Sequence, residues 1–263
     1  MIEPVINSVL TLSGIGLVSG LGLGIAAKKF AVFVDPRVLA IEQVLPSANC
    51  GACGFAGCHN FAESVVTGKA DVSGCLVGKD AVAQKVAAVM GIEAKTGQFM
   101  VARLLCQGDD CKAERKYHYL GIQDCKAASL LAGGDKACAY GCLGLGSCVG
   151  VCPVNAISLN GNGLVKVDEA KCIGCKKCTL VCPRKVIQMV PAAQEVTVLC
   201  NSVDKGPVVK KNCQIGCIGC ALCKKACPVE GAIVVENFLA RINPQLCDRC
   251  KKCVAKCPTH AII

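Results

Sequence analysis

The hydrophobic and polar positions divide the chain into one long apolar stretch near its start and a remainder of short apolar runs between polar loops. Residues 5–27 carry no charged side chain. As an α-helix this stretch would be about 34 Å long, enough to cross the hydrocarbon core of a bilayer. The pattern predicts a transmembrane anchor over residues 1–28. A buried helix and a signal peptide are the alternatives. A signal peptide begins with basic residues, whereas the only charged residue before this stretch is Glu3.

The charges and glycines around this stretch predict its orientation and its setting. Lys28, Lys29 and Arg37 follow it, which places the bulk of the chain in the cytoplasm by the positive-inside rule. Glycines recur at four-residue spacing, at Gly16, Gly20 and Gly24. This spacing allows another helix to approach closely, so we expect the anchor to pack within a membrane complex.

Short apolar runs in the second half of the chain predict strands, each shortly after a Cys-Pro pair. They occupy residues 154–159, 184–189, 231–235 and 260–263. Cysteine-rich turns and short helical segments separate them. The expected fold class is α+β.

The composition is unusual for its cysteine content: 25 cysteines in 263 residues, with no Trp and 3% aromatic residues. Such a content indicates disulfides, zinc or iron–sulfur clusters. Disulfide frameworks belong mostly to short secreted chains. A long chain with an odd number of cysteines favours reduced thiols that bind metal, and with so few aromatic residues the metal would supply part of the folding free energy.

The formal net charge of +10 changes meaning once clusters are counted. A [4Fe-4S] core held by four thiolates carries about −2, so roughly five of them bring the holoprotein near neutrality. No run of interleaved aromatic and basic residues accompanies the positive charge. The sequence therefore offers no support for nucleic-acid binding.

The first candidate site lies in a glycine-rich loop after the anchor. Its cysteines are spaced C-x2-C-x4-C-x16-C, at Cys50, Cys53, Cys58 and Cys75. Zinc is the alternative, since C-x2-C pairs also make zinc sites. Three thiols within nine residues favour a [4Fe-4S] cluster, and we do not expect the adjacent His59 to be a ligand.

Three copies of the bacterial ferredoxin array C-x2-C-x2-C-x3-C-P follow, and a variant copy precedes them. In such arrays the fourth cysteine ligates the neighbouring cluster. The copies repeat at an offset of 75 residues, as from Cys152 to Cys227, and predict two duplicated two-cluster ferredoxin-like modules. The three complete sites expected from cross-ligation are Cys152, Cys172, Cys175 and Cys178; Cys217, Cys220, Cys223 and Cys257; and Cys227, Cys247, Cys250 and Cys253.

The variant copy lacks one cysteine, because Leu145 stands where the offset places the partner of Cys220. Its remaining cysteines, Cys142 and Cys148, would form a site with Cys182. Cys138, one helical turn before Cys142, is the expected fourth ligand. A three-cysteine cluster that activates a substrate is the alternative.

These five sites leave several cysteines unassigned. Cys125 and Cys200 are related by the same offset of 75, as are Cys138 and Cys213. Cys106 and Cys111 repeat the C-x4-C spacing of the first site. The sequence therefore predicts at least five [4Fe-4S] clusters. A sixth cluster, held by Cys106, Cys111 and Cys125 with either Cys200 or Cys213, is one interpretation of the remaining cysteines. The alternative is that they are buried thiols without a ligand role.

The order of an anchor, the loop PSANCGACGFAGCHNFAESVVTG and the variant array CAYGCLGLGSCVGVCP resembles the family of the B subunits of Rnf electron-transport complexes. The resemblance covers essentially the whole chain. It implies an iron–sulfur subunit of an ion-translocating ferredoxin:NAD oxidoreductase, with other subunits, the membrane and an acidic ferredoxin donor as partners. For residues beyond about 190, the assignments come from the motifs alone.

The expected organisation is an anchor (1–28), an N-terminal [4Fe-4S] domain (29–90), a cysteine-containing connector (91–124) and two ferredoxin-like modules (125–190 and 191–263). No dinucleotide-binding unit, phosphate loop or nucleophile–base set is recognisable. We therefore expect electron transfer without a self-contained catalytic site, with nicotinamide or flavin chemistry on other chains. A ferredoxin-like subunit of another membrane oxidoreductase, such as a hydrogenase or a molybdenum enzyme, and a zinc-rich structural or nucleic-acid-binding protein are the competing hypotheses.

Overall fold

The computed structural model describes residues 3–30, 35–94 and 98–263. Parts of three expected domains therefore lie outside the described residues: 1–2 of the anchor, 31–34 of the N-terminal domain and 95–97 of the connector. The helices are α1 (Glu3–Lys29), α2 (Pro36–Val44), α3 (Cys58–Val66), α4 (Lys79–Met90), α5 (Cys125–Leu130), α6 (Ser147–Gly150), α7 (Lys177–Val181), α8 (Gly206–Asn212), α9 (Leu222–Ala226) and α10 (Lys252–Ala255). The strands are β1 (Met100–Leu104), β2 (Ile157–Leu159), β3 (Val165–Val167), β4 (Ile187–Pro191), β5 (Ile233–Glu236) and β6 (Leu239–Ile242).

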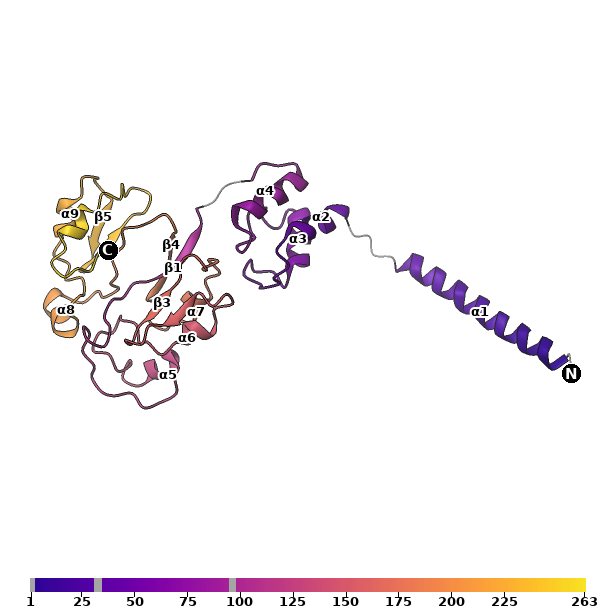
Figure 1. Cartoon of the computed structure of the whole chain (residues 1–263), viewed down its shortest axis with the longest axis horizontal. Helices are drawn as coiled ribbons and strands as arrows, with labels where there is room; N and C mark the ends of the chain where they lie inside the picture. The colour runs from indigo at the N-terminus through magenta and orange to yellow at the C-terminus, as the bar shows by residue number, and fades with distance from the viewer. Residues whose placement is uncertain (1–2, 31–34, 95–97) are drawn as a thin grey trace.

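Helix α1 projects away from the rest of the chain (Figure 1). By length and composition its residues Val9–Lys29 could cross a membrane, and none of that span is buried against the protein. Apolar side chains that stay exposed along a whole helix need an apolar surrounding.

Helices α2, α3 and α4 form a small domain around an apolar core. Helix α2 packs against both α3 and α4. Ile41, Phe61 and Val86 are fully buried or nearly so at their contact. Pro36 occupies the first turn of α2, and Asp35 caps that helix by accepting a hydrogen bond from the Arg37 amide. This core supports the loop that carries the first three cysteines.

The connector is part of the first module, because it supplies strand β1. This strand pairs antiparallel with β4 over five residues, from Met100 opposite Pro191 to Leu104 opposite Ile187. A second antiparallel pair joins β2 to β3. Val101, Val186 and Ile157 form the buried centre between these two-stranded sheets.

The second module repeats this arrangement with fewer regular strands. Strands β5 and β6 form its antiparallel hairpin, and residues 197–199 lie beside the C-terminus. There Leu199 N donates to Ala261 O (2.7 Å), as Leu105 N donates to Val186 O (2.8 Å) in the first module. Of the four predicted strand runs, the first three form β2, β4 and β5, whereas the run at 260–263 makes only an isolated bridge from Ile262 to Val198.

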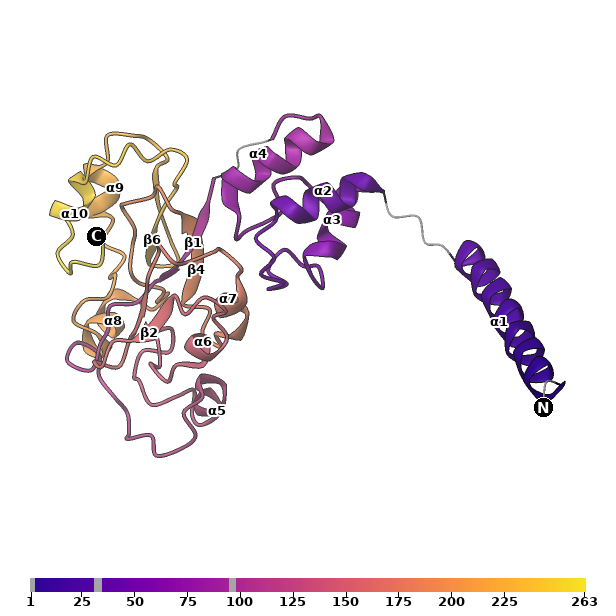
Figure 2. The same cartoon turned by 45° about the vertical axis from the view of Figure 1, so that its right-hand side comes forward.

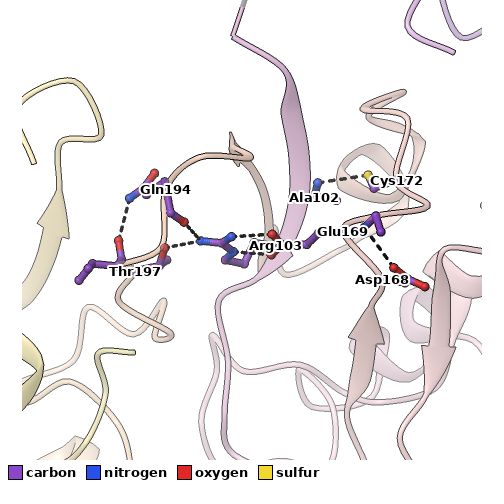
Figure 3. A network of polar contacts seen from close by, with 9 residues as sticks. Ala102, Arg103, Asp168, Glu169, Cys172, Gln194 and Thr197 are labelled. Carbon is purple, nitrogen blue, oxygen red and sulfur yellow. Dashed lines mark hydrogen bonds and ion pairs between the residues drawn. The ribbon is translucent and has the colours of Figure 1, made fainter. Parts of the chain in front are cut away.

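Arg103 on β1 ties the two modules together (Figure 3). Its guanidinium donates to both carboxylate oxygens of Glu169, each at 2.7 Å. It also donates to Gln194 O (2.6 Å) and to Thr197 Oγ1 (2.7 Å), in the segment that leads into the second module. The side chain is 11% exposed, so these charge-assisted bonds are largely shielded from water.

Candidate iron–sulfur sites

The cysteine thiols gather around cavities. All 25 are free. Within the described ranges, no three His, Cys, Asp or Glu side chains converge closely enough for a single metal ion. Instead, four cavities are each lined by four cysteines, which come from two or more segments of the chain. A cluster that is larger than one ion matches this arrangement.

The N-terminal cavity contains all four cysteines of the first motif, Cys50, Cys53, Cys58 and Cys75. Gly51 and Gly54 adopt positive φ angles, which let the loop wrap around the cavity. The Asn49 side chain holds the loop to helix α3 by accepting a hydrogen bond from Cys58 N (2.8 Å). His59 faces away toward Glu42, with Nδ1 3.0 Å from Oε2, in keeping with its expected exclusion from the ligands.

The inner cavity of the first module is lined by Cys152, Cys172, Cys175 and Cys178. This is the cross-ligated set expected from the array. Backbone amides already point at its sulfurs: Ala102 N lies 3.4 Å from Cys172 Sγ (Figure 3) and Ala156 N lies 3.2 Å from Cys152 Sγ. Burial raises the pKa of Cys178 to about 11, and the neighbouring thiolates of Cys172 and Cys175 contribute to the rise.

The loop cavity departs from the expected grouping. It is lined by Cys142, Cys148 and Cys182, but its fourth thiol belongs to Cys125. The structure places Cys138 in the lining of a different cavity, so it does not bring Cys138 together with these three. Burial raises the pKa of Cys148 to about 12, with Cys142 and Cys125 among the thiolates that add to the shift.

A chain of hydrogen bonds brings Cys125 to the loop cavity. Asp124 caps helix α5 by accepting from Ala127 N (2.8 Å). Its other carboxylate oxygen accepts from Ser147 Oγ (2.7 Å), and that hydroxyl accepts from Cys125 N (2.7 Å). Ser147 begins α6, directly before Cys148, so the cap of one helix is fixed to the start of the other.

The junction cavity lies between the two modules and is lined by Cys106, Cys138, Cys200 and Cys213. Burial raises the pKa of Cys138, and the thiolates of Cys106 and Cys213 raise it further. Burial likewise raises the pKa of Cys200 to about 11, with Cys217 and Cys138 contributing. Two cysteines that the sequence suggested as ligands of a sixth cluster do not line the junction cavity. Cys125 lines the loop cavity, and Cys111 is exposed and lines none of the four cavities.

Each module contributes an equivalent pair of thiols to the junction cavity. Cys106 directly follows Leu105, and Cys200 directly follows Leu199, the two residues that make matching hydrogen bonds in their modules. Cys138 and Cys213 are related by the offset of 75. Cys106 therefore corresponds to Cys200 in the fold, whereas the offset alone related Cys125 to Cys200.

The second module brings its thiols together in the two expected groups. Burial raises the pKa of Cys223 to about 11, and the thiolates of Cys217, Cys220 and Cys257 add to the shift. For Cys253 burial again raises the pKa, with Cys247 and Cys227 as the contributing thiolates. Cys250, the fourth cysteine of this expected group, is exposed.

The donor set of these sites fits [4Fe-4S] clusters. Each cavity offers four sulfur ligands in an apolar surrounding, and backbone N–H groups are directed at several of the sulfurs, which is how proteins stabilise clusters and adjust their potentials. Leu105 and Leu199 line the junction cavity, and Leu143, Val186 and Ile187 line the loop cavity.

Family models match most of the cysteine-bearing chain. A model described as "Putative Fe-S cluster" covers residues 45–77. Three models described as 4Fe-4S dicluster domains cover residues 137–189, 171–232 and 209–258. The overlapping matches follow the succession of arrays along both modules.

Three relatives that match this chain along its whole length are B subunits of ion-translocating oxidoreductase complexes. The chain is 44% identical over 262 residues to the B subunit of the Na(+)-translocating ferredoxin:NAD(+) oxidoreductase complex of Acetobacterium woodii, covering 100% of this chain and 78% of that protein. It is 42% identical to the B subunit of the ion-translocating oxidoreductase complex of Methanosarcina acetivorans (100% and 99% covered). It is 46% identical to the B subunit of the proton-translocating ferredoxin:NAD(+) oxidoreductase complex of Clostridium ljungdahlii (99% and 92% covered). With four-cysteine cavities along its length and these relatives, the chain belongs to the family of B subunits of the ion-translocating ferredoxin:NAD oxidoreductase (Rnf) complexes.

Proposed function

We propose that this chain relays electrons from ferredoxin, through a series of six [4Fe-4S] clusters, to other subunits of an ion-translocating ferredoxin:NAD oxidoreductase complex. The observation that carries the proposal is the succession of four-cysteine cavities from the N-terminal domain to the junction between the modules, which the two arrays of the second module continue. When bound, each cluster accepts and passes on one electron. The chain supplies ligands, spacing and surrounding charge.

The six ligand sets follow from the cavities and the arrays. The N-terminal and inner cavities and both second-module sites keep the sets expected from the sequence. Cys125 completes the loop site in place of the cysteine missing at Leu145, which removes the reason to expect a three-cysteine cluster there. Cys138 becomes a ligand of the sixth site, in the junction cavity.

Contacts between neighbouring sites support a linear order. Lys177, within the array of the inner site, donates to Cys50 O of the N-terminal site (3.4 Å). The thiolate of Cys178 in the inner site adds to the rise that burial causes in the pKa of Cys148, so these two sites adjoin.

The order continues into the second module. Cys142 N of the loop site donates to Cys106 Sγ of the junction site (3.4 Å). Burial raises the pKa of Cys200 in the junction site, and the thiolate of Cys217 in the next site adds to this rise. The junction cluster would thus connect two modules that otherwise form separate pairs of sites.

The domain organisation follows the same sites. We propose an N-terminal cluster domain over residues 29–90 and two ferredoxin-like modules over 125–190 and 191–263, with the connector 91–124 supplying β1 and Cys106 to the first module and its junction. Helix α1 would cross the membrane, and Lys28 and Lys29 at its end favour a cytoplasmic location for everything after it. An alkaline phosphatase fused to the C-terminus would then be inactive, and an active fusion would contradict this orientation.

Iron analysis of the anaerobically purified full chain tests the proposal. Six clusters require about 24 iron atoms per chain and five require about 20, at four iron atoms per cluster. Cys213→Ser should remove the junction cluster, because a serine hydroxyl replaces one of its thiolates. Cys111→Ser, at an exposed cysteine outside the cavities, is the matched control and should leave the iron content unchanged. An iron content near 20 in the wild type, unaffected by Cys213→Ser, would contradict the sixth cluster.

A further inference from the structure

A fully buried lysine lies between the loop and junction cavities. Lys136 is 0% exposed, and its ammonium donates to Gly108 O (2.7 Å) and Gly163 O (3.2 Å). Gly108 adjoins the junction cavity, since a Cβ built on it would lie 3.2 Å from Cys213 Sγ. Lys136 itself lines that cavity. The second acceptor, Gly163 O, adjoins the loop cavity, since a Cβ built on Gly144 in the lining of that cavity would collide with this oxygen.

An arginine reaches the same region from the other side. Arg184, two residues after Cys182, lines the loop cavity. Its guanidinium donates to the carbonyl oxygens of Cys138, Gly141 (3.3 Å) and Gly133. The guanidinium therefore lies between the loop cavity and the chain that carries Cys138. An arginine side chain stays charged in proteins.

Neither cation has a carboxylate partner in the described part of the chain. The nearby Asp135 and Asp110 both pair with Arg115, and Asp109 pairs with Lys112. A buried charge is costly unless opposite charge compensates it. The groups placed to compensate Lys136 and Arg184 are therefore the thiolates of the two cavities.

The repeat shows that these cations are specific to this place. At the offset of 75 residues, Lys136 corresponds to Lys211, which is exposed, and Arg184 corresponds to Thr259, which is neutral. The second module therefore has no equivalent of this pair at its own site around Cys217. Common descent of the two modules does not account for the two charges, of which Lys136 is fully buried and Arg184 half-buried.

We propose that Lys136 and Arg184 form a cationic bridge that raises the reduction potentials of the clusters in the loop and junction cavities. This inference rests on the proposed ligand sets. A reduced cluster with four thiolates carries about −3 and an oxidised one about −2, so a fixed buried cation stabilises the reduced form more strongly. The bridge also lessens the repulsion between two adjacent negative centres. Both residues act through the clusters and are tuning residues without a role as ligands.

Potentiometric titration monitored by EPR, on the full chain with its clusters, tests the bridge. Cys125→Ser and Cys213→Ser first identify which one-electron steps belong to the two cavities. Lys136→Met removes the ammonium and keeps an apolar stem; Arg184→Gln removes the guanidinium charge. Each should lower the reduced-to-oxidised ratio of those two clusters at least tenfold at a fixed potential, which is about 59 mV for one electron, while the other four clusters stay unchanged.

Matched variants separate charge from structure. Arg184→Lys retains the charge and should keep most of the wild-type potential. Lys211→Met, at the exposed counterpart, should shift nothing. Unshifted potentials in Lys136→Met and Arg184→Gln with the full iron content would overturn the bridge while leaving the ligand sets intact. Equal cluster loss in Arg184→Gln and Arg184→Lys would show a purely structural role and also overturn it. A wild type with no cluster in the junction cavity would instead contradict the ligand sets and, with them, the bridge.

Discussion

At the scale of single residues, the loop site shows how one thiol can replace another from a different part of the chain. In the second module the regular array supplies Cys220 from the same turn as Cys217 and Cys223. In the first module Leu145 occupies that array position, and Cys125 reaches the cavity from helix α5 instead. The cap at Asp124 and the hydroxyl of Ser147 fix its approach.

Exchange of these two positions gives a direct test. Cys125→Ser should lower the iron content by about four atoms per chain, because one thiolate of a [4Fe-4S] site is lost. Adding Leu145→Cys to that variant restores the regular array and should recover most of the lost iron. Iron analysis and the reduced-state EPR spectrum of reconstituted protein measure both effects. Two results together would instead support the grouping expected from spacing: full iron content in Cys125→Ser, and loss of the EPR signal of the loop cluster in Cys138→Ser.

The regular sites could be predicted from the sequence because three of their four ligands lie in one turn. Spacing alone then fixes the loop, and cross-ligation supplies the fourth residue. Cys125 and Cys138 could not be assigned in this way. Both reach their cavities through tertiary contacts. The spacing of Cys138 from Cys142 suited a shared site, but the thiol of Cys138 lies in the junction cavity.

At the scale of elements, strand β1 shows where the repeat departs from its constant offset. The hydrogen bonds relate Leu105 to Leu199, 94 residues apart, whereas the arrays repeat at 75. The difference of 19 residues is an insertion between β1 and the first array of the module. The strands after the first three Cys-Pro pairs were predictable from their local apolar runs. The pairing of β1 with β4 spans more than 80 residues and has no local signal.

Arg103 on this strand should contribute measurably to stability. Arg103→Met keeps the apolar stem but leaves Glu169, Gln194 and Thr197 without their charged donor. We expect the unfolding free energy to fall by about 2–3 kcal/mol, the range for hydrogen bonds to charged groups. Anaerobic denaturant titration, followed by the visible absorbance of the clusters, measures the change.

Arg241→Met is the matched control, because Arg241 lies on strand β6 with its side chain exposed. A surface substitution of this kind changes stability by about 0.5 kcal/mol or less. If both variants unfold at the same denaturant concentration, the Arg103 network does not hold the modules together.

At the scale of the whole molecule, α1 and the second module lie at opposite ends of the chain, with the N-terminal domain and the first module between them (Figures 1 and 2). An electron that enters at the second module would therefore pass the successive sites on its way toward the membrane. Residues 200–263 carry ten basic and four acidic side chains. Two clusters subtract about four charges and leave this module positive.

The basic side chains of the second module form the expected docking surface for an acidic ferredoxin. Helices α9 and α10 pack against one another, and they carry the exposed pairs Lys224–Lys225 and Lys251–Lys252 within or directly before them. Lys251 also pairs with Glu195 at 2.9 Å. Both side chains of that pair are exposed, so the pair is weak in water and leaves Lys251 accessible to a partner. These four lysines and the two cluster sites of the second module therefore lie at the same end of the molecule.

Reversing these four lysines to Glu should slow reduction by ferredoxin about tenfold or more at low ionic strength, since electrostatic steering contributes factors of that order to association. The rate should also no longer fall as salt is added, because the altered module would repel an acidic ferredoxin and salt screens that repulsion. Stopped-flow reduction of the reconstituted chain measures both. Lys69→Glu with Lys85→Glu, exposed on the N-terminal domain, is the control for the pair Lys224→Glu with Lys225→Glu, because each reverses two charges. If the two double variants slow the reaction equally, net charge alone governs the encounter; if neither changes it across a salt series with all clusters present, ferredoxin docks on another surface.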